Sequence, residues 1–200
     1  AVGAMRPYAV ITVTPKGEAS LLKGHPWVYE AEVSAIDGDV KDGDLVDVRS
    51  RKGSYLGTGF YNSHSLIRVR LVSRNANDRF DEAFWGRRVQ YAWDYRKTVM
   101  GQQDSRCCRV IFGEADQFPG LTVDRYENVL VAQVLSLGIE QRKDVIFSQL
   151  LRVLREDGQE IAGIFERNDV SIREKEGMAQ GKGWYLLPSE SVPDMSTVGI

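Results

Sequence analysis

Short apolar runs alternate with Asp/Gly/Asn/Ser turns at close, regular spacing between residues 8 and 73, and this pattern restricts the fold more than any other feature of the chain. The last of these runs alternates apolar with basic residues, as a strand with one buried face does. The strands that we expect lie at residues 8–14, 27–36, 45–49, 55–61 and 66–72, with a short helical turn at residues 18–23. Several short strands in so little chain are typical of a small β-barrel.

The hydrophobic period changes to that of a helix in residues 78–100. Trp85 and Trp93 fall on one face of this helix, and Asp78 is the expected N-cap. Gly and polar residues follow, so residues 74–105 are predicted to form a helical linker.

A second unit is expected over residues 106–190. Its predicted strands lie at residues 109–112, 121–126, 129–135, 161–165, 170–172 and 184–187, around a helix at residues 140–155. This order makes a small layer of the β-β-α-β-β type. The predicted fold class is therefore α+β: a small β-barrel, a helical linker, and a second α+β domain. Residues 1–7 are interpreted as a tail, with Ala1–Ala4 an expression scar before Met5, and residues 191–200 as a linker.

Composition excludes several classes of protein. The chain carries 26 Lys and Arg against 28 Asp and Glu, a net charge of −2, which is not the basic excess of a dedicated nucleic-acid binder. No apolar run approaches the roughly 18 residues of a membrane span, and no signal peptide opens the chain. The only two cysteines are adjacent and make no disulfide framework, so we expect a cytoplasmic protein with no membrane partner.

Two groups of residues have the chemistry needed to contact RNA. Lys23, His25 and Trp27 bring a cation, an imidazole and an indole into one short segment, which suits phosphate contact and base stacking. The alternative is that Trp27 anchors the core and Lys23 is a solvated charge. The second group would make a positive face on the barrel. It comprises residues 49–52, which include Arg51 and Lys52, residues 61–64, which begin with Tyr61, and Arg68 and Arg70. Exposed cations on a strand edge also protect against aggregation.

The carboxylates Glu114, Asp116 and Asp124 surround two turns in residues 109–126. Acidic oxygens near a turn suit Mg²⁺, which makes a metal-dependent enzyme one hypothesis. A DxDxDG-type ligand spacing is absent from this segment and no His lies nearby, so we expect no metal site. The mixed charges of residues 166–169 and 173–176 favour ion pairs over a site.

No catalytic apparatus is recognisable in the sequence. Cys107 and Cys108 lack the CxxC spacing of a zinc site and a neighbouring activating group, so packing is the expected role. The glycines at positions 53, 57 and 59 lie inside a strand pattern, which is the wrong context for a nucleotide phosphate loop. No Walker, HExxH or GxSxG motif occurs.

Four motifs occur in an order and spacing that resemble a known family. They are GHPWVYEAEV (residues 24–33), DLVDVRSRKGSYLGTGFYNSHSLIRVRLVSR (residues 44–74), RVIFGEADQFPGLTVDRY (residues 109–126) and ERNDVSIREKEGM (residues 166–178). Together they resemble the amino-terminal part of PUA-domain-containing, S-adenosylmethionine-dependent methyltransferases that make 5-methylcytosine in large-subunit ribosomal RNA. The resemblance covers nearly all of residues 8–190, with Gln117 and Phe118 as mild departures from the family pattern.

The resemblance implies a PUA barrel at residues 8–73 and the family's middle domain at residues 106–190. The Rossmann-like domain, which brings the S-adenosylmethionine loop and the catalytic cysteine, would be missing, and neither Cys107 nor Cys108 matches a catalytic motif. The chain is thus expected to be a fragment that docks ribosomal RNA and has no catalytic residue and no cofactor of its own, S-adenosylmethionine belonging to the full-length protein.

The resemblance also assigns roles to residues of both domains. Lys23, Arg51, Lys52 and Arg68 would contact RNA phosphates, with His25 and Trp27 or Tyr61 stacking or packing nearby. The residues expected to wall the substrate cleft are Glu114, Asp116, Pro119, Asp124, Arg125, Arg167 and Arg173. Two alternatives remain: a stand-alone RNA-binding module, and an architectural module that forms homodimers.

Overall fold

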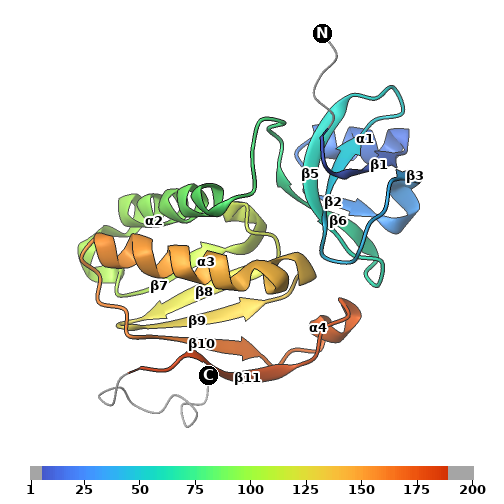
Figure 1. Cartoon of the computed structure of the whole chain (residues 1–200). Helices are drawn as coiled ribbons and strands as arrows, with labels where there is room; N and C mark the ends of the chain where they lie inside the picture. Colours follow the sequence, from blue (N-terminus) through green and yellow to red (C-terminus); the bar gives the residue numbers. More distant parts are fainter. Residues whose placement is uncertain (1–5, 189–200) are drawn as a thin grey trace. The chain divides into compact units, whose positions relative to one another are not determined.

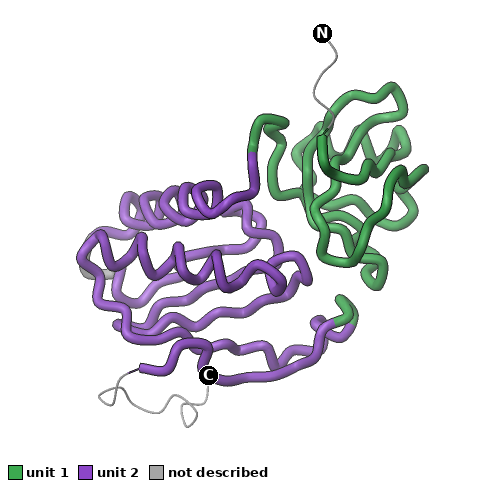
Figure 2. The backbone as a smooth tube through the Cα atoms, viewed as in Figure 1, with its two compact units in different colours: residues 1–78, 175–177 green, residues 79–174, 178–200 purple. Residues whose placement is uncertain are grey.

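The computed structural model describes residues 6–188, apart from the side chains of residues 102–104, and forms two compact units. Unit 1 comprises the chain up to residue 78 together with residues 175–177, and unit 2 comprises the rest (Figure 2). The scar expected at the start of the chain and the linker expected at residues 191–200 lie outside the described residues.

Unit 1 is a curled six-stranded sheet with the order β2-β6-β5-β4-β1-β3 (Figure 1). Its strands are β1 (Ala9–Val13), β2 (Trp27–Tyr29), β3 (Val33–Asp37), β4 (Leu45–Arg49), β5 (Tyr55–Tyr61) and β6 (Ile67–Ser73). The core side chains include Ile11, Val46 and Val69, which are fully buried. The predicted α+β class is confirmed. The sheet of unit 1 is a half-barrel and not a closed barrel, because β2 and β3 are its edge strands.

Two local features of unit 1 differ from expectation for identifiable reasons. Helix α1 (Pro15–Leu22) begins earlier, because Pro15 suits the first helical turn and the Thr14 hydroxyl accepts a hydrogen bond from the Gly17 amide at 3.2 Å. The run expected as one strand at residues 27–36 is divided by the 3₁₀ turn η1 (Glu30–Glu32), where the Glu32 carboxylate accepts a hydrogen bond from the Tyr29 amide at 3.0 Å.

Unit 2 is a five-stranded sheet with two long helices on one face (Figure 1). The strand order is β11-β10-β9-β8-β7. The strands are β7 (Cys107–Phe112), β8 (Leu121–Tyr126), β9 (Val129–Val134), β10 (Gly163–Asn168) and β11 (Gly181–Leu186), and η2 (Gly113–Asp116) joins β7 to β8. Helix α3 (Leu137–Glu156) connects the parallel strands β9 and β10.

Helix α2 (Glu82–Asp104) was expected to link the two domains, but it packs against α3 and β7 as part of unit 2. Its N-cap is Asp81 and not Asp78, since the Asp81 carboxylate accepts a hydrogen bond from the Phe84 amide at 2.9 Å. Trp93 is fully buried and donates its indole N–H to Asp157 at 2.9 Å. Gly101 kinks the helix near its end with φ 67°, a value that few other residues adopt without strain.

The prediction of a strand at residues 170–172 is wrong, because helix α4 (Ile172–Lys175) begins there. Its Arg173 side chain is buried and donates hydrogen bonds to the carbonyls of Val134 and Ala179. The helical turn aims this long side chain back at the sheet, and the contacts are to residues distant in sequence. In residues 6–188, the structure contains no helix long and apolar enough to cross a membrane.

Tyr185 of β11 gives unit 2 a signature in alkaline solution. Partial burial, together with donation of its hydroxyl to Asp144 at 2.6 Å, raises the pKa of Tyr185 to about 12. Because the folded-state pKa lies above the unfolded value of 10.0, this group's contribution to stability is complete below pH 10 and is lost as pH rises towards 12. In an absorbance titration at 295 nm, we expect Tyr185→Phe to remove about one tyrosine from the step near pH 12. An unchanged step would contradict this assignment.

Candidate nucleic-acid interface

Three aromatic rings lie together on the edge strand of unit 1. His25 precedes β2, and Trp27 and Tyr29 begin and end it. The His25 ring centroid is 5.9 Å from those of Trp27 and Tyr29, and the two larger rings lie 6.3 Å apart. The His25 Nδ1 atom accepts a hydrogen bond from the Trp27 amide at 3.2 Å, which fixes the imidazole beside the indole. Because these rings are only partly buried or exposed, they offer aromatic surface to a ligand.

Cations lie close to this aromatic cluster. Lys23 caps α1 and is exposed. Arg74 donates to the carbonyls of Leu21 at 2.7 Å and His25 at 3.0 Å, which fastens the connection from α1 to β2. The sequence analysis did not identify Arg74, because its partners lie about fifty residues away, and its only signal is its position just after a predicted basic strand.

The strand register separates the exposed turn with Arg51 and Lys52 from Trp27. Trp27 pairs with Arg70 of β6, and Arg70 pairs with Phe60 near the end of β5. The turn with Arg51 and Lys52 precedes the start of β5, and Phe60 lies five residues, or about 16 Å, beyond that start. Lys23, His25 and Trp27 therefore form one exposed or partly buried group, and Arg51 and Lys52 form a separate exposed group.

Tyr61 and Arg68 differ from these exposed residues. Tyr61 is 8 % exposed and packs in the core of unit 1, so its ring presents no face on which a base could stack. Arg68 lies on β6 between the partners of Val28 and Tyr29, and it pairs with Glu30 at 2.8 Å and donates to the Ser65 carbonyl at 2.9 Å. Its charge is thus already partly neutralised within the protein.

Three carboxylates of unit 2 were predicted to line a substrate cleft. Two of them contact other groups of unit 2, and the third lies in η2. The Asp116 carboxylate accepts a hydrogen bond from the Phe112 amide at 2.7 Å and lies 3.7 Å from Arg96. Asp124 pairs with Arg109 at 2.8 Å, and this contact raises the pKa of Arg109. Glu114 lies in η2 and is partly buried. No cluster of potential metal ligands occurs in the part of the chain that the structure describes.

The remaining cleft residues are also mainly structural. Arg125 is 4 % exposed and donates to Ser105 and Glu127 carbonyls and to the Gln159 side chain, and desolvation lowers its pKa. Pro119 is buried and its carbonyl accepts a hydrogen bond from the Ser136 hydroxyl at 2.6 Å. Arg173 is buried as described above. Arg167 remains partly exposed, at 3.8 Å from Asp169.

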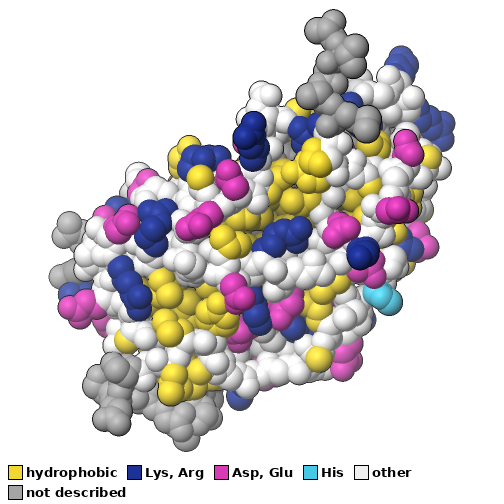
Figure 3. Space-filling view, viewed as in Figure 1, with side chains coloured by type: hydrophobic (Ala, Val, Ile, Leu, Met, Phe, Trp, Pro, Cys, Tyr) yellow, Lys and Arg dark blue, Asp and Glu magenta, His cyan; other side chains and the backbone are white. Residues whose placement is uncertain are grey.

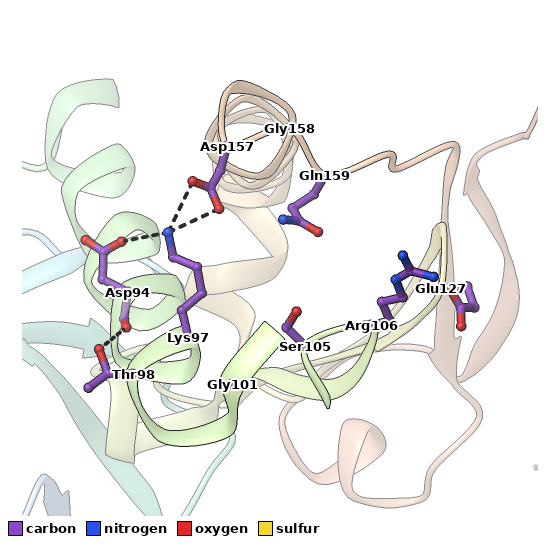
Figure 4. Close-up of a pocket in the computed structure, with 10 residues that line it drawn as sticks. All are labelled: Asp94, Lys97, Thr98, Gly101, Ser105, Arg106, Glu127, Asp157, Gly158 and Gln159. Atoms are coloured by element: carbon purple, nitrogen blue, oxygen red, sulfur yellow. Dashed lines mark hydrogen bonds and ion pairs between the residues drawn. The ribbon is translucent and has the colours of Figure 1, made fainter. Parts of the chain in front are cut away.

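A polar cavity of about 1260 Å³ opens in unit 2 beside the end of α2 (Figure 4). Lys97 lies between two carboxylates there, at 3.1 Å from Asp157 and 3.7 Å from Asp94. The side chains that line the cavity include none of the predicted site residues, and Arg125 borders only a smaller adjoining cavity. Lys97 and its acidic neighbours neutralise one another.

The surface in Figure 3 carries mixed charges and no broad basic region. On the face shown in Figure 3, Lys and Arg side chains are interspersed with Asp and Glu side chains. Affinity for a polyanion would therefore depend on particular groups, such as the aromatic cluster and the exposed cations of unit 1.

Comparisons with known proteins identify similar sequences. Residues 11–74 match the model of the PUA-like domain family. The chain is 36% identical over 170 residues to the ribosomal RNA large subunit methyltransferase I of Alteromonas mediterranea, covering 85% of this chain and 42% of that protein. It is 35% identical over 184 residues to the protein of the same name from Klebsiella pneumoniae, covering 90% of this chain and 45% of that protein. The chain is thus homologous to these proteins and spans less than half of their length.

A solved structure shares the fold. It is described as a putative SAM-dependent methyltransferase from Streptococcus mutans, with a TM-score of 0.66 and 19% identity, and the match covers 79% of this chain and 40% of that one. The two-unit α+β architecture therefore occurs within a longer protein.

Proposed function

We propose that this chain is the RNA-docking part of an S-adenosylmethionine-dependent ribosomal RNA (cytosine-5) methyltransferase, and that it does not catalyse methyl transfer by itself. The observation that carries this proposal is the group of accessible aromatic rings next to the exposed Lys23, in a unit that matches the PUA-like family. The names of the homologous proteins supply the substrate, large-subunit ribosomal RNA. With such a substrate, we expect the protein to act in the cytoplasm.

In this proposal, different residues make different contacts with RNA. Lys23, Arg51 and Lys52 contact phosphates, which position the RNA without reading its sequence. His25 and Trp27 offer ring surface to an unpaired base. Tyr61 is left out because it is buried, and Arg68 contributes less because Glu30 already pairs with it.

The residues of unit 2 do not fit the cofactor. The crossover from β9 through α3 to β10 is where a nucleotide-like ligand would bind in a parallel α/β fold. Here the Val134 amide donates to Asn168 at 2.9 Å, Arg173 binds the Val134 carbonyl, and the Ser136 hydroxyl is used by Pro119. These contacts use the polar groups at the end of β9. We therefore place S-adenosylmethionine and the catalytic cysteine in the part of the longer protein that this chain does not include.

Binding of a large-subunit ribosomal RNA fragment at two salt concentrations tests the proposal. We expect Lys23→Ala and the double variant Arg51→Ala/Lys52→Ala to weaken binding. Each lost phosphate contact should reduce the slope of log K against log salt by about 0.7 to 0.9. Lys41→Ala is a matched control for the double variant, since this exposed lysine precedes β4, whereas Arg51 and Lys52 follow it. Equal binding by all four proteins would contradict an RNA interface at Lys23, Arg51 and Lys52.

A further inference from the structure

The connection between α1 and β2, residues 23–26, carries the exposed Lys23 and the partly buried His25. Gly24 lies between them with φ 96°, in the left-handed region that favours glycine. A Cβ atom at Gly24 would meet no other atom within 4 Å, so packing does not hold the backbone at this point. The conformation of the connection therefore depends on its hydrogen bonds.

The backbone amides of this connection donate to the end of α1. The Lys23 and His25 amides both donate to the Ser20 carbonyl at 3.2 Å, and the Gly24 amide donates to the Leu21 carbonyl at 3.0 Å. These bonds satisfy the last carbonyls of the helix. An eight-residue helix such as α1 is only marginally stable by itself in water, so its end gains from an anchor on another element.

Arg74 supplies that anchor from the sheet. It follows β6, and its Nη1 atom donates to the Leu21 carbonyl at 2.7 Å while its Nη2 atom donates to the His25 carbonyl at 3.0 Å. One planar side chain thus joins the last turn of α1 to the connection, on either side of Gly24. A cation is also favoured beside the partial negative charge of a helix C-terminus. Within the described part of the chain, Arg74 forms no ion pair with a carboxylate.

The segment that Arg74 holds leads directly into the aromatic cluster. The His25 Nδ1 atom accepts the Trp27 amide at 3.2 Å, and the two ring centroids lie 5.9 Å apart. The backbone position of His25 therefore sets where its ring lies beside the indole. β6 holds Trp27 by pairing through Arg70, and Arg74, after the same strand, holds the residues that precede Trp27.

We propose that Arg74 is a positioning residue of the RNA interface, whose two hydrogen bonds hold Lys23 and His25 in the arrangement that contacts RNA. This inference rests on the proposed RNA-docking function and deepens it. Arg74 acts without touching RNA, because its Nη1 and Nη2 atoms are already engaged by two carbonyls. A connection fixed in its bound conformation loses less conformational entropy on binding, so releasing it weakens affinity although no contact to RNA is removed.

Fluorescence anisotropy with the whole chain and the labelled ribosomal RNA fragment tests this role. We expect Arg74→Ala to weaken binding about tenfold, because the freed connection samples other conformations. Arg74→Lys keeps the charge but lacks the rigid fork of a guanidinium, so binding should remain about fivefold weaker. A direct phosphate contact would be restored by lysine, and that restoration would overturn the proposal. Arg79→Ala, which removes an exposed arginine shortly after Arg74 in the sequence, is the matched control.

Two further measurements distinguish positioning from a general loss of stability. Without RNA, NMR should show faster exchange of the Gly24 and His25 amides in Arg74→Ala, while the amides of β5 keep their rates. A double-mutant cycle of Arg74→Ala with His25→Ala should show a combined loss of affinity smaller than the sum of the separate losses, because Arg74 acts through His25. Additive losses would contradict the positioning role.

The outcomes separate this inference from the proposed function. Unchanged binding by Arg74→Ala, with weaker binding by Lys23→Ala, would overturn the positioning role and leave the RNA interface of unit 1 in place. Unchanged amide exchange in Arg74→Ala would also overturn it, since the connection would then keep its conformation without the guanidinium. Failure of the unaltered chain to bind the ribosomal RNA fragment would overturn both.

Discussion

Gly59→Ala is expected to prevent unit 1 from folding. A Cβ atom at this position would lie 2.3 Å from the carbonyl oxygen of Arg70 and 2.8 Å from the Cα of Leu71, both backbone atoms of the adjacent strand. The register of β5 against β6 shifts between Thr58 and Gly59, so the two backbones approach closely at this irregularity. Relief would require the central β5–β6 ladder to open, and we expect a loss of more than about 4 kcal/mol.

Hydrogen exchange measured by mass spectrometry would check this result in each unit separately. Peptides from residues 8–73 should lose protection in Gly59→Ala, while those of unit 2 keep theirs. Gly183→Ala is the control, because a Cβ at Gly183 meets no atom within 4 Å and its φ is not in the left-handed region. Full protection of β5 and β6 in Gly59→Ala would show that the sheet can relax around an added methyl group.

The same position explains why the glycines of β5 are not a phosphate-binding loop. Their spacing invites that interpretation, which the strand context of the sequence already disfavoured. In the structure Gly59 permits close contact with β6, and Gly57 has φ 157° with Leu71 and Ser73 atoms 3.0 Å from the position of a Cβ. Packing between strands is therefore the reason for both glycines.

Local patterns predicted much of the fold. The strands at residues 45–49, 55–61 and 121–126 were located to the residue, because alternation and flanking turns are both encoded within a few positions. Boundaries failed where a side chain hydrogen-bonds to a backbone group. Glu32 accepts from the Tyr29 amide where β2 ends early, and Arg173 donates to the Ala179 carbonyl where a strand was expected.

The candidate interface was predictable to the extent that its residues are neighbours in sequence. Lys23, His25 and Trp27 lie within five residues of one another, and the structure keeps the His25 and Trp27 rings together. Tyr61 was expected to stack or pack nearby, and the structure buries it, as it buries β5 along nearly its whole length. The partners of Asp124 and Arg125 lie on other elements, which no local pattern reveals.

Glu176→Ala is the second large effect that we expect. Glu176 belongs to unit 1 and is 3% exposed. One carboxylate oxygen lies 2.8 Å from the Arg70 guanidinium and 2.7 Å from the Ser65 hydroxyl, and Asn62 donates to the Glu176 backbone carbonyl at 2.7 Å. Removing the carboxylate leaves the charge of Arg70, a residue only 6% exposed, without its acidic partner, and breaking a buried pair in this way costs about 3–5 kcal/mol.

The position of Arg70 connects this pair to the proposed RNA interface. The Arg70 guanidinium lies 5.2 Å from the centre of the Trp27 ring, so Glu176 holds the cation that packs against the indole. We therefore expect Glu176→Ala to lower the stability of unit 1 in urea and also to change the exchange of β2 amides.

Two further variants separate charge from shape. Glu176→Gln should lose less stability than Glu176→Ala, because an amide still hydrogen-bonds Ser65. Glu174→Ala, which removes an exposed carboxylate two residues earlier, should change stability by less than about 0.5 kcal/mol. If Glu174→Ala and Glu176→Ala lost equally little stability, the Arg70–Glu176 contact would stabilise unit 1 no more than a surface ion pair does. The position of Trp27 would then depend on β2–β6 pairing alone.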